Sequence, residues 1–81
     1  MENFPKLEGI QVAVIRAEVA TGHMYDIDFN LVISDQQEIY SIFDSKEDAI
    51  DYIKNFIESN RKFEFTIFDK GGDLIKMITP D

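Results

Sequence analysis

Three acidic residues are the side chains whose type and spacing could best support chemistry. Asp26 and Asp28 stand two residues apart in a predicted strand, so their carboxylates would share one face, ~7 Å apart along it. Glu64, in a later predicted strand, could join them. Grouped carboxylates can bind a hard cation such as Mg²⁺ or Ca²⁺, or serve as the acid and base of a glycosidase. The alternative is the polar, solvent-facing side of an antiparallel sheet, which is the expected arrangement.

No nucleophilic motif accompanies these carboxylates. The sequence has no Cys and one His, His23, which follows Gly22 in a predicted turn. A general base needs an oriented partner, so His23 is interpreted as a solvated loop residue. The Gly71-Gly72 pair lacks the helix that follows a phosphate-binding loop, and we interpret it as a hairpin turn. We therefore expect no catalytic, cofactor-binding or metal-binding residues and no cofactor.

The charge of the chain narrows the classes of partner. Sixteen Asp and Glu against eight Lys and Arg give a net charge of −8. Such a surface repels the phosphates of nucleic acids and anionic lipids, so direct binding to nucleic acid or membrane is not expected. An acidic surface attracts a basic protein, although the same charge can serve solubility alone.

The ends of the chain and its hydropathy favour a soluble cytoplasmic protein. Residues 1–8 lack the basic region and apolar stretch of a signal peptide. No apolar run approaches the ~18–20 residues of a transmembrane helix, and the last residues carry no lipidation motif. With 81 residues, the chain has room for a single domain.

The beginning of the chain predicts a lead-in and a strand. Residues 1–9 form the lead-in, and the β-branched run at 10–20 is typical of a strand. The apolar phase of this run shifts near Arg16, which predicts a β-bulge there.

Two further strands are expected before the helix. Residues 25–34 alternate apolar and polar side chains with the period of a half-buried strand. Residues 38–43 form a third, short strand. Because polar turns separate the three strands, we expect a meander over residues 10–43.

The second half predicts one helix and a β-hairpin. A helix over 45–60 begins at Asp44 or Ser45 as N-cap, and apolar residues then recur at helical spacing. Residues 63–79 form two strands around the glycine turn. The order β-β-β-α-β-β over residues 1–81 predicts a two-layer α+β domain. Its five-stranded, mainly antiparallel sheet would carry one helix on one face.

A second group of residues is a candidate interaction surface. Tyr40, Ile42 and Phe68 lie out of phase with the main apolar residues of their strands, so the helix would leave them partly exposed. A cluster of such residues marks an interface. The first strand carries no Pro, so it would be the less protected edge of the sheet if it lay outermost. We therefore expect a homodimer or a basic protein partner.

Two segments of the second half resemble the small uncharacterised bacterial family called domain of unknown function 2188. They are residues 43–50 (FDSKEDAI), similar to its helix start, and residues 64–75 (EFTIFDKGGDLI), similar to its closing strands and glycine turn. The resemblance covers the second half only. It implies a fold and no activity.

Two functions follow as hypotheses. The first is a non-enzymatic acidic interaction module that binds or inhibits a basic partner protein. Its contact surface would be drawn from Asp26, Asp28, Glu64, Tyr40, Ile42 and Phe68. The second is a small metal-dependent or acid–base enzyme built on the three carboxylates.

Overall fold

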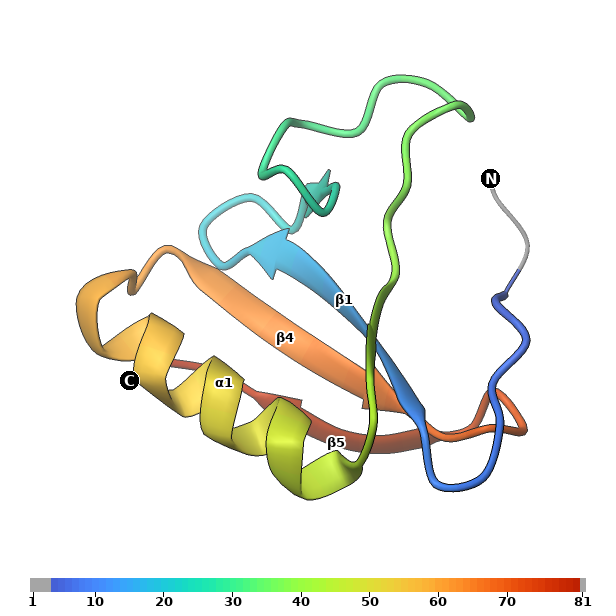
Figure 1. The fold of residues 1–81 in the computed structure, drawn as a ribbon. Helices are drawn as coiled ribbons and strands as arrows, with labels where there is room; N and C mark the ends of the chain where they lie inside the picture. Colours follow the sequence, from blue (N-terminus) through green and yellow to red (C-terminus); the bar gives the residue numbers. More distant parts are fainter. Residues whose placement is uncertain (1–3, 81) are drawn as a thin grey trace.

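Strand β1 (Val12–Glu18) lies at the centre of the antiparallel sheet in the computed structural model, which describes residues 4–80. Strand β4 (Phe63–Phe68) pairs with one edge of β1, and β5 (Leu74–Ile78) pairs with β4 (Figure 1). The prediction of a final hairpin is confirmed, with Gly72 at a positive φ of 84° in its turn. Because β1 is central, it is not the exposed edge that we considered from the sequence.

Strands β2 (Met24–Tyr25) and β3 (Ser41–Phe43) both pair with β1 and not with each other. They share one edge of β1: Met24 lies opposite Ala17, and Ile42 lies opposite Ala13. The meander predicted for residues 10–43 is therefore wrong in its pairing. The α+β class, the single helix on one face and the order β-β-β-α-β-β are confirmed within the part of the chain that the structure describes.

The predicted β-bulge near Arg16 is also wrong. The register between β1 and β4 runs without interruption from Ala13 to Glu18. The irregularity of the sheet lies instead between Ile67 and Phe68, where β4 pairs with β5. Arg16 itself is buried on the same side of β1 as the core residues Val12 and Val14. A charged residue in a core position therefore produced the apparent change of phase.

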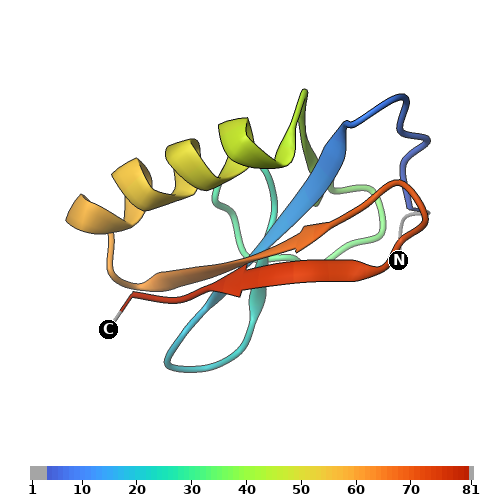
Figure 2. The ribbon, with the colours of Figure 1, turned by 90° about the horizontal axis from the view of Figure 1, so that it is seen from below.

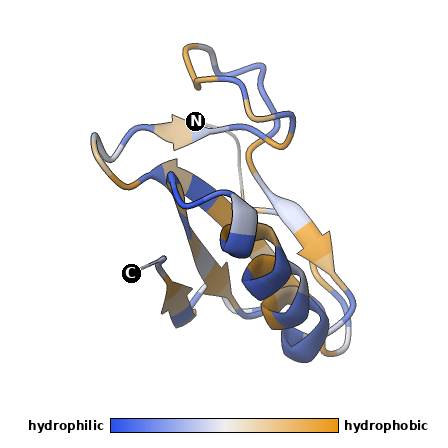
Figure 3. Cartoon of the chain, turned by 90° about the vertical axis from the view of Figure 1, so that its left-hand side faces the viewer, coloured by the Kyte–Doolittle hydropathy of each residue, from blue (hydrophilic) through white to orange (hydrophobic). Residues whose placement is uncertain are grey.

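Helix α1 (Lys46–Ser59) begins at the predicted N-cap. The Oγ atom of Ser45 accepts a hydrogen bond from the backbone N–H of Asp48 at 3.1 Å, which satisfies one of the free amides of the first turn. The end of the helix is held by Asn60, whose side-chain amide donates to the carbonyl of Phe56 at 3.0 Å. Hydrophilic residues dominate the outer side of the helix (Figure 3).

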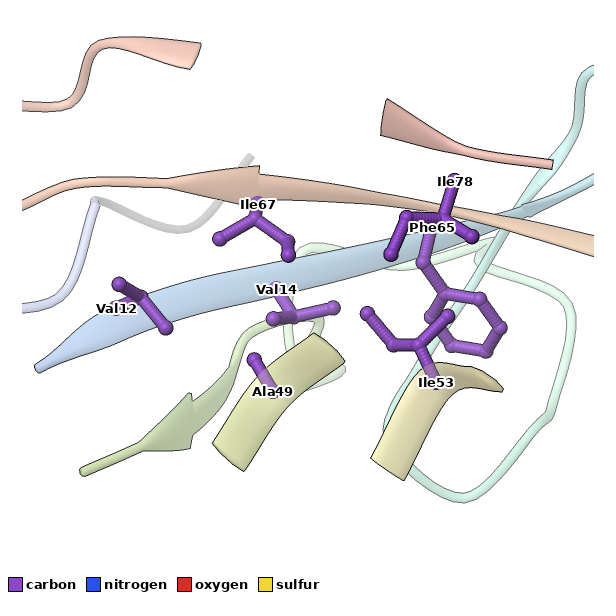
Figure 4. Close-up of a cluster of buried hydrophobic side chains, with 7 residues drawn as sticks. All are labelled: Val12, Val14, Ala49, Ile53, Phe65, Ile67 and Ile78. Atoms are coloured by element: carbon purple, nitrogen blue, oxygen red, sulfur yellow. The ribbon is translucent and has the colours of Figure 1, made fainter. Parts of the chain in front are cut away.

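The inner side of α1 forms the main core with one face of the sheet (Figure 2). Ala49 and Ile53 point at side chains from β1, β4 and β5, and each of these core residues is at most 8% exposed (Figure 4). Burying an aliphatic or aromatic side chain completely contributes about 1.5–3 kcal/mol relative to exposure. The sheet residues of this cluster are Val12, Val14, Phe65, Ile67 and Ile78.

The lead-in contributes to the fold on the opposite face of the sheet. Phe68 lies opposite the fully buried Ala13, and the ring of Phe4 meets the rings of Tyr40 and Phe68 edge-on at 5.3 and 6.1 Å. Tyr40 and Phe68 are consequently half-buried, whereas Ile42 on the same face is 48% exposed. These three predicted surface residues therefore share one side of the sheet, partly covered by the chain before β1.

Candidate functional site

A long loop replaces the strand that we predicted over residues 25–34. Of residues 25–34, only Tyr25 belongs to β2, and a single β-bridge joins Tyr25 to Leu31. Residues 26–40, which we call the 26–40 loop, extend beyond the end of β1 (Figure 1). Two side chains, Asp26 and Gln37, fix the path of the backbone in this loop.

Asp26 turns the chain back on itself. Its Oδ1 atom accepts hydrogen bonds from the backbone N–H groups of Asp28 and Asn30, both at 2.9 Å. Its own backbone N–H donates to the carbonyl of Asn30 at 2.9 Å. This side-chain cap competes with strand pairing, as Asp side chains commonly do in turns. Asp26 is 6% exposed and is therefore a structural part of the loop.

The same hydrogen bonds stabilise the ionised form of Asp26. The side-chain amide of Gln37 and the backbone amides of Asn30 and Asp28 hold the pKa of Asp26 below its usual value. The positive charge of Arg16 acts in the same direction, whereas burial opposes it. Asp26 is therefore a carboxylate whose oxygens are engaged within the protein.

Gln37 connects three parts of the loop. Its Nε2 atom donates to Oδ2 of Asp26 at 2.8 Å and to the carbonyl of Leu31 at 2.9 Å. Its Oε1 atom accepts from the backbone N–H groups of Ile33 and Ser34 at 2.7 and 3.0 Å. These four hydrogen bonds of one side chain hold the loop in a defined shape, and no pattern in the sequence indicates a role for Gln37.

Arg16 lies beneath the loop in an aromatic environment. Its guanidinium carbon is 5.4 Å from the centre of the Phe29 ring and 6.0 Å from that of Phe65. Its Nη2 atom donates to Oγ of Ser41, while Nη1 is buried without a hydrogen-bond acceptor among the described residues. Burial lowers the pKa of Arg16, and the nearby Tyr52 and Asp26 oppose this effect. Arg16 thus joins the central strand to the loop.

The outer side of the 26–40 loop combines acidic and apolar groups. Ile27, Leu31 and Ile33 are 38%, 43% and 83% exposed. Asp28 and Glu38 are exposed in the same segment. Hydrophobic and hydrophilic stretches alternate along it (Figure 3). Exposed apolar groups bordered by polar residues can mark a surface that contacts another protein.

The stretch of sequence that contains this loop is rich in acidic residues. Between Arg16 and Lys46 there is neither Lys nor Arg, and this stretch, residues 17–45, holds six acidic residues. Counted over this stretch alone, six negative and no positive residues give a formal charge of −6 when His23 is neutral. The six residues are Glu18, Asp26, Asp28, Asp35, Glu38 and Asp44.

A pocket of about 390 Å³ opens at the base of the loop. Its apolar lining comes from Met24 of β2 and from Val32, Ile33 and Ile39 of the loop. Asp35 contributes an acidic group to the same pocket. The pocket is therefore an apolar hollow within the most acidic segment of the chain.

The structure does not place the predicted carboxylates on a common face. Asp26 is buried in the loop, Asp28 is exposed beside it, and Glu64 lies on β4 opposite Ala17 of β1. Within residues 4–80, no group of three or more His, Cys, Asp or Glu side chains is arranged to hold a metal ion. The shared face was inferred from a strand over 25–34, so it is wrong for the same reason as that strand.

Comparison with known proteins adds no relative from which a function could be transferred. No family model, no curated protein and no solved structure matches this chain. The resemblance of residues 43–50 and 64–75 to the family named above therefore stays a prediction. Among the residues described, no helix is long and apolar enough to cross a membrane.

Proposed function

We propose that this chain is a non-enzymatic interaction module that binds a basic protein through its 26–40 loop. The observation that carries the proposal is the joint exposure of apolar and acidic groups on this loop, in a 29-residue stretch without Lys or Arg. Like-charged partners are repelled by such a surface, while a basic partner is attracted and oriented. The apolar side chains would then add contact area at the centre of the interface.

The shape of the loop supports binding without a large ordering cost. Asp26 and Gln37 fix the backbone through hydrogen bonds of 2.7–3.0 Å, so the exposed side chains project from a defined scaffold. A preorganised loop loses less conformational entropy on association than a flexible one. The hydrogen bonds of Asp26 therefore support a structural role for this residue in the module.

A finer version of the proposal concerns the class of basic partner. Proteins that bind nucleic acids carry Lys and Arg clusters that match phosphate charges. A rigid acidic loop on a protein with net charge −8 can compete for such a cluster. We propose an inhibitor of this kind, acting in the cytoplasm, as the specific form of the module.

The proposal is tested by capture from native lysate with a matched pair of charge variants. The double variant Asp28→Asn, Glu38→Gln removes two exposed carboxylates from the loop. The control, Asp51→Asn, Glu58→Gln, removes the same two types of charge from exposed positions on helix α1. Both variants change the net charge from −8 to −6, because each converts two acidic residues to neutral ones.

We expect the wild-type chain and the helix variant to retain a stoichiometric basic partner at low salt. The loop variant should lose it, and about 0.5 M salt should release it from the wild-type chain and the helix variant by screening. Equal loss of the partner from both variants would show that net charge alone is responsible. Retention by the loop variant would place the contact elsewhere.

Self-association is a second candidate, favoured by strand β5. This strand pairs only with β4 in the described sheet, and it exposes Leu74 and Met77 by 57% and 52%. The unpaired edge of a strand is a template for another strand. We propose that two copies of the chain associate through β5 and not through β1, because β1 is paired on both edges.

A further inference from the structure

Helix α1 covers one face of the sheet, and we call the opposite face the open face (Figure 2). Successive side chains of a strand point to opposite faces, so residues that alternate with the core residues lie on the open face. The register aligns Ile15 of β1, Thr66 of β4 and Met77 of β5 in one row across it. A second row, across β3, β1, β4 and β5, contains Ile42, Ala13, Phe68 and Leu74. The open face is therefore one continuous surface built from four strands.

Apolar side chains remain exposed on this face. Ile42, Leu74 and Met77 are each about half exposed, and Ile15 is half-buried. The lead-in covers one end of the face, where the ring of Phe4 packs. A sheet is stabilised when its apolar faces are buried against another layer, and an exposed apolar patch marks a site of contact. The rest of the open face therefore offers a docking surface.

Charge favours a second copy of the chain over a basic protein at this surface. The two rows contain no charged residue, and Glu64 lies beyond them, opposite Ala17. The net charge of −8 is thus carried by other parts of the surface. Two copies can meet through the rows without placing like charges against each other. A basic protein would lose the hydration of its Lys and Arg side chains there without gaining partners for them.

The size of the open face corresponds to a weak dimer. The three longer strands have five to seven residues. With a rise of ~3.3 Å per residue and ~4.8 Å between strands, the four strands give a flat area of roughly 400 Å² per copy. A contact that buries less than about 1,200 Å² in total is typical of a weak, transient complex. We therefore expect an association that depends strongly on protein concentration.

We infer that two copies of the chain pack through their open faces, with the two helices on the outside. The two sheets would form a sandwich with ~10 Å between them, and the exposed apolar side chains of both rows would be removed from water. Strand β5 takes part through Leu74 and Met77. The inference therefore rests on the self-association proposed above, and it assigns the contact to the open face of β5 and not to its edge.

Two lysine variants test which surface is used. Ile42→Lys places a charge on the open face in β3, which β1 and β4 separate from the free edge of β5. Ile10→Lys is the matched control, because Ile10 is also exposed but lines a hollow beside Lys46 and Glu47 at the start of α1. Light scattering between about 10 and 100 µM should show a mass that rises with concentration for wild type and Ile10→Lys. Ile42→Lys should weaken the association by about ten-fold or more, because each copy would bury an unpaired charge.

A measurement on the unmodified protein makes the test independent of how the variants fold. In ¹⁵N-labelled wild type, we expect the amide resonances that shift between about 10 and 100 µM to lie in β1, β3, β4 and β5. Pairing of two β5 edges would confine these shifts to β4 and β5. Circular dichroism checks that both lysine variants are folded.

Each contrary outcome overturns the inference in a distinguishable way. Unchanged association of Ile42→Lys, with shifts confined to β4 and β5, would assign the dimer to the free edge; the inference would then fail while self-association stands. Equal weakening by both lysine variants would show that the position of the charge does not matter. Shifts centred on residues 26–40 would place the contact on the loop. A constant monomer mass at about 100 µM would exclude self-association itself and leave the binding of a basic protein by the loop unaffected.

Discussion

The guanidinium of Arg16 lies under the ring of Phe29, with 5.4 Å between the guanidinium carbon and the ring centre. Phe29 has a φ of 62°, in the left-handed region that a bulky side chain rarely adopts. Its ring also stacks on Phe56 of helix α1, with 5.0 Å between the ring centres. A strained loop residue therefore packs between a buried charge of the central strand and the helix.

Replacing Arg16 by Met should increase the stability of the domain. The substitution removes a buried charge whose Nη1 atom has no acceptor among the described residues, and it keeps most of the side-chain volume. Replacing a buried ion pair by apolar groups of similar size is often neutral or stabilising. In the same way, we expect the relief of desolvation to outweigh the contacts that Arg16 loses with Ser41, Phe29 and Asp26. We expect the free energy of unfolding to rise by about 1 kcal/mol in urea denaturation.

The exposed Lys54→Met variant controls for the loss of one positive charge from a protein with net charge −8. A fall in stability for Arg16→Met that Lys54→Met does not share would mean that Arg16 stabilises the fold through Ser41 and Phe29.

Asp26 should make stability depend on pH in the acid range. The pKa of its carboxyl is lower in the folded state, mainly because of the hydrogen bond from Gln37. The ionised form is therefore favoured by folding, so this contribution is complete above the unfolded pKa of about 3.9. It is lost as the pH falls through the lower folded pKa.

The measurement is the urea midpoint of wild type and Asp26→Asn between about pH 2 and pH 7. The variant should be less stable at neutral pH, and the difference should shrink below about pH 4. Asp51→Asn, at an exposed helix position, is the matched control for removing one carboxylate. A difference between wild type and Asp26→Asn that is constant over the whole range would contradict the role assigned to Asp26.

The core around helix α1 should be sensitive to a single truncation. Ile53 is fully buried between the helix and the sheet, so Ile53→Ala should destabilise by about 2–5 kcal/mol. A domain of this size derives only about 3–5 kcal/mol from its core, so the variant should be largely unfolded by circular dichroism. Ile10→Ala, at a 75% exposed position, should change stability by less than about 0.5 kcal/mol.

Self-association should depend on strand β5 and on salt. Two copies of charge −8 repel, and salt at about 0.15 M screens this repulsion beyond about 8 Å. We therefore expect a dimer that weakens as salt is lowered, measured by light scattering. Leu74→Lys places a charge on the exposed edge and should give a monomer, whereas Ile10→Lys should not. A constant monomer mass at about 100 µM wild-type protein would exclude the dimer.

The sequence was sufficient to predict the helix and the final hairpin. In both, local chemistry and tertiary packing agree: Ser45 caps the helix, Ala49 and Ile53 give it an apolar side, and the glycine pair forms the hairpin turn. Consistent signals of this kind identify an element reliably.

The loop was mistaken for a strand because its residues alternate in polarity. Asp26, Asp28 and Asn30 occupy the polar positions of that alternation, but Asp and Asn are depleted in strands. The Asp26 side chain instead accepts from the backbone two and four residues ahead. The presence of three such residues within five positions was the feature of the sequence that indicated a loop. The role of Gln37, which depends on contacts with four separate residues, had no local signal.

The central claim is that the 26–40 loop binds a basic partner. Chemical-shift mapping of the protein during titration with a basic peptide, Lys-Lys-Leu-Lys-Lys, tests it most directly. With ¹⁵N-labelled protein, the account predicts that the amides which move most on titration lie in residues 24–40. The amide resonances of the outer side of helix α1 should not shift, although Glu47, Asp51 and Glu58 are exposed there. Shifts of equal size on the loop and on the helix, or shifts centred on the helix, would contradict the assignment of the 26–40 loop as the docking surface.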